Sequence, residues 1–195
     1  MATILLVYES SEGQTAKVAS FVASELRDRD HRVDVERASD LPSTLDVERY
    51  DGVLIGASVH AGEHQTPVRR FVTANRDTLS SAPSGFFSVS LSAASEDEQS
   101  REAAAEIAED FLADVEWEPD QVALVPGALK YSKYGFFKRL LLREIARRES
   151  GDTDTSQDYE YTDWDSVAEF ADDFARLVEE ATPMAPDSGD AASSE

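Results

Sequence analysis

The sequence predicts an α/β fold in which a doubly wound sheet of five parallel strands is covered by helices on both faces. Strand-like runs alternate along the chain with segments of helical periodicity. Three of these runs are nearly continuously apolar, which is typical of strands that are buried on both sides. The alternation itself favours a parallel sheet. The predicted strands are Ile4–Tyr8, Arg32–Glu36, Gly52–Ala57, Gly85–Leu91 and Gln121–Pro126.

Four amphipathic segments are predicted helices, namely Ala16–Arg29, Pro67–Ser80, Asp97–Val115 and Asp163–Glu180. In the last of these, Asp163 precedes an apolar stripe at helical spacing and is the predicted N-cap. The residues after Glu180 are small and acidic and have no periodic apolar face. We therefore expect one domain over residues 1–180, followed by a disordered acidic tail over residues 181–195.

The loop behind the first strand is built to hold a phosphate. It contains hydroxyls, one glycine and a threonine directly before the first helix, as Ser10, Ser11, Glu12, Gly13, Gln14 and Thr15. Backbone N–H groups at a helix N-terminus attract an anion, and hydroxyls donate further hydrogen bonds. The loop has no lysine and lacks the Walker spacing, so it suits a single phosphate monoester, as on FMN, better than a nucleoside triphosphate. The alternative is an ordinary strand-to-helix turn with a Ser/Thr cap.

Two further loops are expected beside the first. Ligands of doubly wound sheets bind at the carboxyl ends of the strands. The third and fourth strands end in Ser58–Glu63 and Ser90–Ser95, which are rich in small and hydroxyl residues. The sequence thus predicts one binding edge formed by three loops.

Composition excludes several classes of function. The chain has no cysteine, which excludes disulfides, iron–sulfur clusters and cysteine nucleophiles, and its three histidines offer little for a metal centre. No apolar run approaches the roughly 20 residues of a membrane span. The N-terminus also lacks a signal-peptide pattern, so we expect a cytoplasmic protein. The strongly acidic composition argues against nucleic-acid binding.

The formal net charge of −22 is extreme for 195 residues. So many like charges repel one another at low salt and are tolerated when salt screens them. We hypothesise a halophilic source and expect the free energy of unfolding to rise as salt is added. Chemical unfolding over a salt series checks this, and a protein that becomes steadily more stable as salt is removed contradicts it.

One stretch, residues 127–158, is an insertion between the fifth strand and the last helix. Between Lys130 and Arg148 it carries seven bases and one acid, interleaved with aromatic residues and leucines. This composition suits an interfacial helix with its apolar side in lipid or on a hydrophobic ligand and its bases on anionic groups. The alternative is a basic surface helix that balances the acidic body.

Several motifs together resemble the flavodoxin-type, menaquinone-dependent protoporphyrinogen IX dehydrogenases. The resemblance runs from about Ile4 to Leu177. The insertion with its flanking motifs is more specific than the first loop, which many flavodoxin-like proteins share. The motifs are Glu12-Gly13-Gln14-Thr15, Ile55-Gly56-Ala57-Ser58, Phe87-Ser88-Val89-Ser90-Leu91, Pro126-Gly127-Ala128-Leu129-Lys130-Tyr131, Gly151-Asp152-Thr153-Asp154-Thr155 and Tyr161-Thr162-Asp163-Trp164.

The resemblance implies a flavodoxin-like fold with non-covalent FMN, whose phosphate lies on the loop from Ser10 to Thr15. It places the flavin ring between the second and third loops, near Ser58, Val59, His60, Ala61 and Gly62 and near Ser90, Leu91, Ser92, Ala93 and Ala94. Gly62 is the position where a peptide flip toward flavin N5 is expected. Glu12 stands where ordinary flavodoxins have a hydroxyl, so we expect its carboxylate to point away from the phosphate. Neither ring loop has a Trp or Tyr to stack on the flavin, and Tyr131 or Tyr134 of the insertion is a substitute.

The implied reaction passes hydrogens from a porphyrinogen through FMN to a menaquinone, with no side chain as the catalytic group. The insertion would then contact substrate or membrane, and residues 130–148 suggest peripheral contact with the inner face of the cell membrane. Its candidate residues are Lys130, Tyr131, Lys133, Tyr134, Phe136, Phe137, Arg139 and Arg143, with Leu140 and Leu141 on the apolar side.

Four further side chains have candidate roles. His60 is a candidate proton donor, whereas Asp152, Asp154 and Asp163 fit turns and caps better than a cation site.

Three other functions stay open: a flavodoxin-like electron carrier, an FMN-dependent quinone reductase, and a membrane-associated domain whose cofactor site has decayed. A diffusing carrier has no need of a basic, aromatic insertion, and an intact first loop argues against decay.

Overall fold

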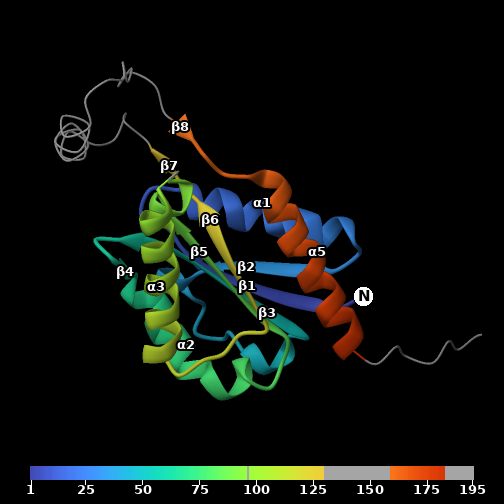
Figure 1. The fold of residues 1–195 in the computed structure, drawn as a ribbon. Coiled ribbons are helices and arrows are strands. Elements are labelled where there is room, and N and C mark those ends of the chain that lie inside the picture. The colour runs from blue at the N-terminus through green and yellow to red at the C-terminus, as the bar shows by residue number, and fades with distance from the viewer. Residues whose placement is uncertain (96, 130–158, 183–195) are drawn as a thin grey trace, which may run out of the picture.

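The computed structural model describes residues 1–95, 97–129 and 159–182, and these form a three-layer α/β domain (Figure 1). Five parallel strands make the central sheet in the order β2-β1-β3-β5-β6. Their bounds are β1 (Thr3–Glu9), β2 (Arg32–Arg37), β3 (Gly52–His60), β5 (Ser84–Ser90) and β6 (Gln121–Pro126). The short strand β4 (Glu63–His64) pairs antiparallel with the end of β3. The predicted doubly wound sheet is confirmed.

Helices cover both faces of this sheet (Figure 1). Helices α1 (Gln14–Asp28) and α5 (Trp164–Ala181) pack on one face, and α2 (Thr66–Leu79) and α3 (Glu98–Asp114) pack on the other. Strand β1 shows why its sequence is continuously apolar. Ile4 and Leu6 are fully buried under α1 and α5, whereas Leu5 and Val7 are fully buried on the opposite face. Alternate residues therefore enter two separate cores.

The ends of several elements differ from the predicted ones. Helix α1 begins at Gln14 rather than Ala16, because Gly13 turns the chain into the helix with a φ of 92°. Strand β3 continues to His60, past the predicted end at Ala57, because β4 supplies a hydrogen-bonding neighbour. The N-cap role of Asp163 is confirmed, since its carboxylate accepts hydrogen bonds from the backbone N–H groups of Asp165 and Ser166.

Three short 3₁₀ turns join these elements: η1 (Ala38–Asp40), η2 (Val47–Arg49) and η3 (Ser92–Ala94). Two further strands, β7 (Ala128–Leu129) and β8 (Tyr159–Glu160), form an antiparallel pair at the base of the insertion. The substrate or membrane residues predicted between 130 and 143, together with Asp152 and Asp154, lie outside the described residues, as does nearly all of the predicted tail.

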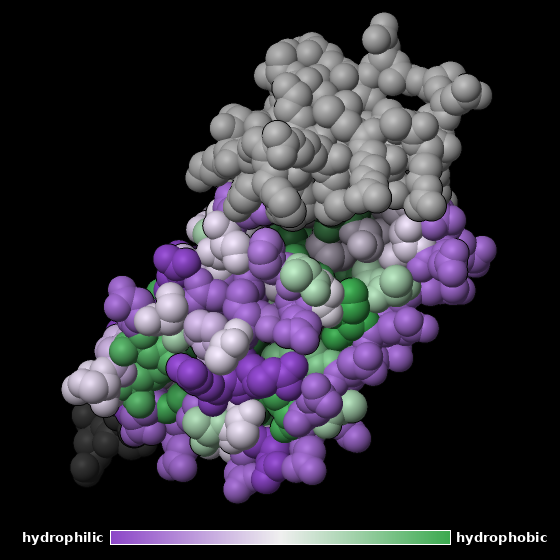
Figure 2. Space-filling view, turned by 90° about the vertical axis from the view of Figure 1, so that its left-hand side faces the viewer, coloured by the Kyte–Doolittle hydropathy of each residue, from purple (hydrophilic) through white to green (hydrophobic). Residues whose placement is uncertain are grey.

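Hydrophilic residues cover most of the described surface that is seen in Figure 2, and apolar residues appear there only in small patches. Within the described ranges, no helix combines the length and the hydropathy that crossing a bilayer requires.

Candidate functional site

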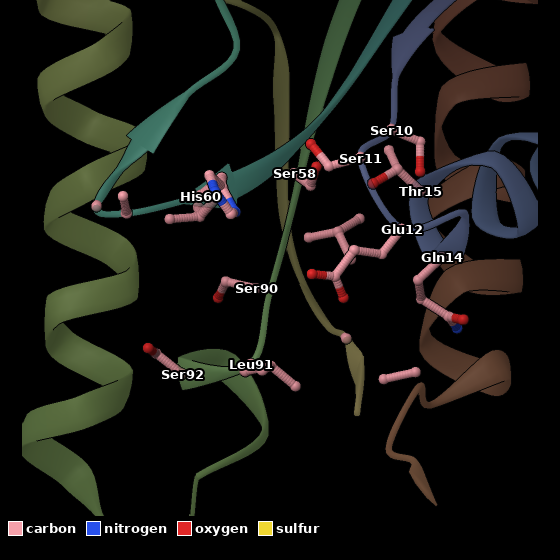
Figure 3. A pocket seen from close by; sticks show the side chains of 16 residues that line it. Ser10, Ser11, Glu12, Gln14, Thr15, Ser58, His60, Ser90, Leu91 and Ser92 are labelled. Atoms are coloured by element: carbon pink, nitrogen blue, oxygen red, sulfur yellow. The ribbon is translucent and has the colours of Figure 1, made fainter. Parts of the chain in front are cut away.

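A pocket lies at the carboxyl edge of the sheet, where three loops meet (Figure 3). The first loop follows β1, the second follows β3 and the third follows β5, as the sequence predicts. The pocket is lined by Ser10, Ser11, Glu12, Gln14, Thr15, Ser58, Val59, His60, Ala61, Gly62, Val89, Ser90, Leu91, Ser92, Gly127 and Ala128. This lining contains no lysine and no arginine, so in the described part of the chain it offers an anion backbone N–H groups, hydroxyls and the His60 ring.

The first loop presents an unpaired hydroxyl beside a helix N-terminus. Thr15 lies in the first turn of α1, and its side chain is 1% exposed. Thr15 Oγ1 finds no hydrogen-bond partner in the described part of the chain. Gly13 caps α1 without any side-chain hydrogen bond, and the first turn of α1 contains no acidic residue. A buried hydroxyl and first-turn N–H groups that lack an intrahelical acceptor fit a phosphate.

An ion pair between the buried Glu9 and the half-exposed Arg37 holds the start of this loop in place. The carboxylate of Glu9, a residue that is 5% exposed, accepts hydrogen bonds from Arg37 Nε at 2.7 Å and from the Ser39 N–H at 2.9 Å. Burial alone would raise the pKa of Glu9, but these hydrogen bonds and the Arg37 charge outweigh it and hold the pKa below its ordinary value. Arg37 also donates to the Ser10 carbonyl at 3.1 Å. The Arg37 guanidinium therefore holds the start of the first loop in place through Glu9 and Ser10.

The second loop is the tip of a tight hairpin between β3 and β4. His60 pairs with Glu63, so the turn consists of Ala61 and Gly62 alone. Both have positive φ, 53° and 85°, which is the geometry of a type I′ turn. Gly62 adopts it freely, whereas Ala61 is strained there. The predicted peptide flip at Gly62 thus concerns a turn that the backbone already holds in an uncommon conformation, and it stays a prediction.

Gln65, which the sequence does not single out, ties the second loop to the first. Its Oε1 accepts the Ser58 N–H at 3.2 Å. Its Nε2 donates to Ser58 Oγ and, at 3.3 Å, to Ser11 Oγ. One amide therefore holds two predicted cofactor loops at a fixed separation. No local pattern signals this role, because Ser11 lies 54 residues earlier in the chain.

His64 also holds the second loop in place, through a contact with Ser58. Its Nδ1 lies 3.3 Å from the Ser58 carbonyl oxygen, and its ring packs edge-on against Phe86 and Phe111. Burial lowers the pKa of His64 from 6.5 to about 4. The hydrogen bond to Ser58 opposes this shift, and the charge of Arg69 adds to it. His64 is neutral near pH 7 and buttresses the loop as an uncharged ring.

We expect His64 to make the fold less stable in mild acid. Its pKa is lower in the folded protein than in the unfolded chain, so between pH 6.5 and pH 4 the unfolded chain binds the proton first. This linkage removes about 2 kcal/mol of stability between pH 7 and pH 5. Because the many carboxylates also titrate, the measurement is the stability of His64→Gln relative to wild type at each pH. The variant's deficit should shrink on acidification, and a constant deficit contradicts the expectation.

The third loop is anchored by Ser90 at the end of β5. Ser90 Oγ accepts the Ala93 N–H at 3.1 Å, and the Ser90 carbonyl accepts the Gly127 N–H at 2.9 Å. The second contact brings Gly127 and Ala128, at the start of the insertion, into the pocket wall. The sequence assigned these two residues to the insertion, so the structure adds them, with Val89, to the site.

Most of the predicted cofactor residues come together, and three do not line the pocket. Gly13 lies in the first loop and shapes it, whereas Ala93 and Ala94 lie in η3 beyond the pocket wall. Figure 3 shows the Glu12 carboxylate directed into the space between the loops and away from the side chains of Gln14 and Thr15. The lining contains no Phe, Trp or Tyr; Tyr131 and Tyr134 lie outside the described residues.

Comparison with known proteins places this pocket in a family. A family model for the flavodoxin domain matches residues 5–156. The protoporphyrinogen IX dehydrogenase (quinone) of Escherichia coli K12 is 34% identical over 178 residues, which cover 91% of this chain and 97% of that protein. The chain belongs to the flavodoxin-type protoporphyrinogen IX dehydrogenase family. The protein of that name from Leishmania major is also 34% identical, over 89% of this chain and 74% of its own length.

Solved structures agree on the fold of this dehydrogenase family member. The flavodoxin of Streptococcus pneumoniae TIGR4 aligns with a TM-score of 0.54 at 15% identity, covering 93% of this chain and all of the other. Oxidised flavodoxin 1 of Bacillus cereus aligns with a TM-score of 0.53 at 16% identity, covering 93% and 99%.

As a member of this family, the protein is an oxidoreductase whose flavodoxin domain takes FMN as its cofactor. The strand order agrees with this assignment, because flavodoxin-like sheets hold FMN where the order reverses, between β1 and β3. The unpaired Thr15 hydroxyl lies at that point.

Proposed function

We propose that this protein oxidises a porphyrinogen to a porphyrin with bound FMN and passes the electrons to a quinone, specifically a menaquinone. The observation that carries the proposal is the 34% identity to protoporphyrinogen IX dehydrogenase, which extends over 91% of the chain and includes the insertion. Three two-electron steps remove six hydrogens from the porphyrinogen. Each step reduces one quinone to a quinol, so that three quinones take up those hydrogens.

The first loop is proposed to hold the phosphate of FMN. Thr15 Oγ1 would donate to a phosphate oxygen, and the first-turn N–H groups of α1 would complete the anion site. Ser10 Oγ already accepts the Gly13 N–H at 2.9 Å, which leaves its proton for the ligand. The remaining lining residues of the second and third loops are proposed to border the flavin ring.

When bound, FMN supplies the hydride acceptor at N5 and the path of the electrons to the quinone. The chain's own part is to hold and surround it. Gln65 and His64 keep the second loop in place, and Glu9 with Arg37 keeps the first. His60, at the end of β3, lines the pocket and is the proposed proton donor at its rim.

The basic residues of the insertion are proposed to meet the anionic end of the substrate. A porphyrinogen of this class carries propionate carboxylates, and the described pocket lining contains a carboxylate, Glu12, but no lysine or arginine. Lys130, Lys133, Arg139 and Arg143, the proposed partners, follow its wall at Gly127 and Ala128 in the sequence. The same composition favours peripheral contact with anionic lipid, where a menaquinone is available.

The deciding experiment is an absorbance spectrum of the purified protein in high salt, followed anaerobically by protoporphyrinogen IX and then by a menaquinone analogue. We expect a yellow protein that bleaches with the porphyrinogen and recovers its colour with the quinone. A yellow protein that is inert to the porphyrinogen would move the function to an electron carrier or a quinone reductase. A protein that binds no FMN would contradict the proposed cofactor site.

A further inference from the structure

The first turn of α1 is fastened to the chain that follows the insertion. Gln14, at the start of α1, is 5% exposed, and Figure 3 shows its side chain turned away from Ser58 and Ser90. Its Nε2 donates to Thr162 Oγ1 at 2.8 Å and to Glu160 Oε1 at 3.3 Å. Both acceptors lie more than 140 residues later in the chain, and together they use both N–H bonds of the amide.

The contact continues to the other side of the insertion. Thr162 Oγ1 donates to the Pro126 carbonyl at 2.8 Å, and the Tyr161 N–H donates to the Gly127 carbonyl at 3.2 Å. The second carboxylate oxygen of Glu160 accepts from Lys17 Nζ at 3.0 Å, one turn further along α1. The hydrogen bonds thus run in one direction from Gln14 through Thr162 to Pro126, and bonds in such a chain strengthen one another.

The chemistry of the partners fixes the orientation of the Gln14 amide. Turning it by 180° would place its oxygen against the Glu160 carboxylate, and neither group can donate. Gln14 Oε1 is buried without a hydrogen-bond partner in the described part of the chain. The two acceptors that follow the insertion therefore fix the orientation of the amide. This orientation leaves the amide oxygen without a hydrogen bond in the described part of the chain.

We propose that Gln14, Thr162 and Glu160 form a clamp through which the base of the insertion positions the phosphate-binding turn of α1. Thr162 and Glu160 are positioning residues that act through Gln14 and do not touch the cofactor. The inference rests on the proposed placement of the FMN phosphate at Thr15. It makes the affinity for FMN depend on Glu160 and Thr162, which lie far from the first loop in the sequence.

The effect should be local to the first turn. The rest of α1 is held by apolar contacts, since Val18, Val22 and Leu26 are fully buried in the sheet core. Loss of the clamp therefore leaves the helix in place and loosens its N-terminus. Thr15 follows Gln14 directly, so a displaced Gln14 moves the hydroxyl and N–H groups offered to the phosphate.

The test compares FMN with riboflavin, which has the same ring but lacks the phosphate. Thr162→Val removes the hydroxyl at nearly constant volume and is expected to raise the Kd for FMN about 5- to 10-fold. The Kd for riboflavin should stay within about 2-fold of the wild-type value. Quenching of flavin fluorescence by titrated apoprotein measures both constants. Equal weakening of both flavins, or no weakening of FMN, would overturn the proposal.

A double-mutant cycle separates the clamp from independent effects. Gln14→Ala loses the contacts to both Thr162 and Glu160 and should weaken FMN at least as much as Thr162→Val. Gln14→Ala/Thr162→Val should then bind FMN about as weakly as Gln14→Ala alone, because Thr162 no longer has an amide to hold. Losses that multiply would show that Thr162 does not act through Gln14. Thr162→Ser retains the hydroxyl and should restore the affinity.

Two further variants keep the result interpretable. Asp172→Asn breaks the half-buried Arg29–Asp172 ion pair at the far end of α1 and should change neither constant. If Thr162→Val does not fold, Glu160→Ala at an exposed position should weaken FMN about 3-fold and spare riboflavin, and an unchanged FMN affinity there counts against the clamp. Because every readout is flavin binding, a wild-type protein that binds FMN but fails to oxidise a porphyrinogen rejects the proposed reaction without rejecting the clamp.

Discussion

Replacing Thr15 with leucine is expected to weaken FMN binding about 100-fold. The Thr15 hydroxyl is buried and has no partner in the described part of the chain, so a phosphate would gain a charge-assisted hydrogen bond there. Leucine removes that donor and adds volume at a residue with 1% exposure. Titration of the apoprotein with FMN, followed by flavin fluorescence, measures the change.

Thr15→Ser is the matched control for this prediction. Serine keeps the hydroxyl and loses one methyl group, so the Kd for FMN should stay within about 3-fold of the wild-type value. A leucine variant with wild-type affinity would show that the FMN phosphate does not bind at this loop. A serine variant as weak as the leucine variant would assign the effect to packing.

The sheet was predictable because its strands are buried on both faces. Ile4 to Val7 enter two cores in alternation, and such a run of β-branched and aliphatic residues has few other uses. The same reasoning fails at the end of β3. Residues Ser58–Glu63 are mostly small or polar and were predicted as a loop, yet Val59 and His60 pair with β4 in a two-residue hairpin. Alanine at a position with positive φ gives no warning of that turn.

The residues that line the pocket were easier to predict than the residues that hold the pocket loops in place. Hydroxyls and glycine behind a strand are a local signal, and most of them do line the pocket. Gln65, Arg37 and Thr162 act through contacts 28 to 148 residues away, and their residue types are common on any surface. Such pairs become visible only when the fold brings their elements together.

The insertion can be removed at its base, where β7 and β8 pair with each other. Strands β7 and β8 are antiparallel, and their last described pair is Leu129 with Tyr159. The backbone therefore leaves and re-enters the domain at neighbouring positions. A two-residue Asn-Gly turn suits such a pair, because both residues adopt positive φ at low cost. Replacing residues 130–158 with Asn-Gly keeps Glu160 and Thr162, and with them the contacts to Gln14.

The excised protein is expected to bind FMN within about 3-fold of the wild-type Kd and to lose porphyrinogen-to-quinone turnover by at least about 100-fold. The three flavin loops stay intact, whereas all the bases proposed to pair with the substrate carboxylates are gone. Flavin titration and anaerobic turnover with a menaquinone analogue measure the two quantities on one preparation. A matched variant that keeps the segment but changes Lys130, Lys133, Arg139 and Arg143 to glutamine separates charge from length. Full turnover by the excised protein would show that the insertion serves neither substrate nor quinone, and loss of FMN binding would show that the cofactor site extends into it.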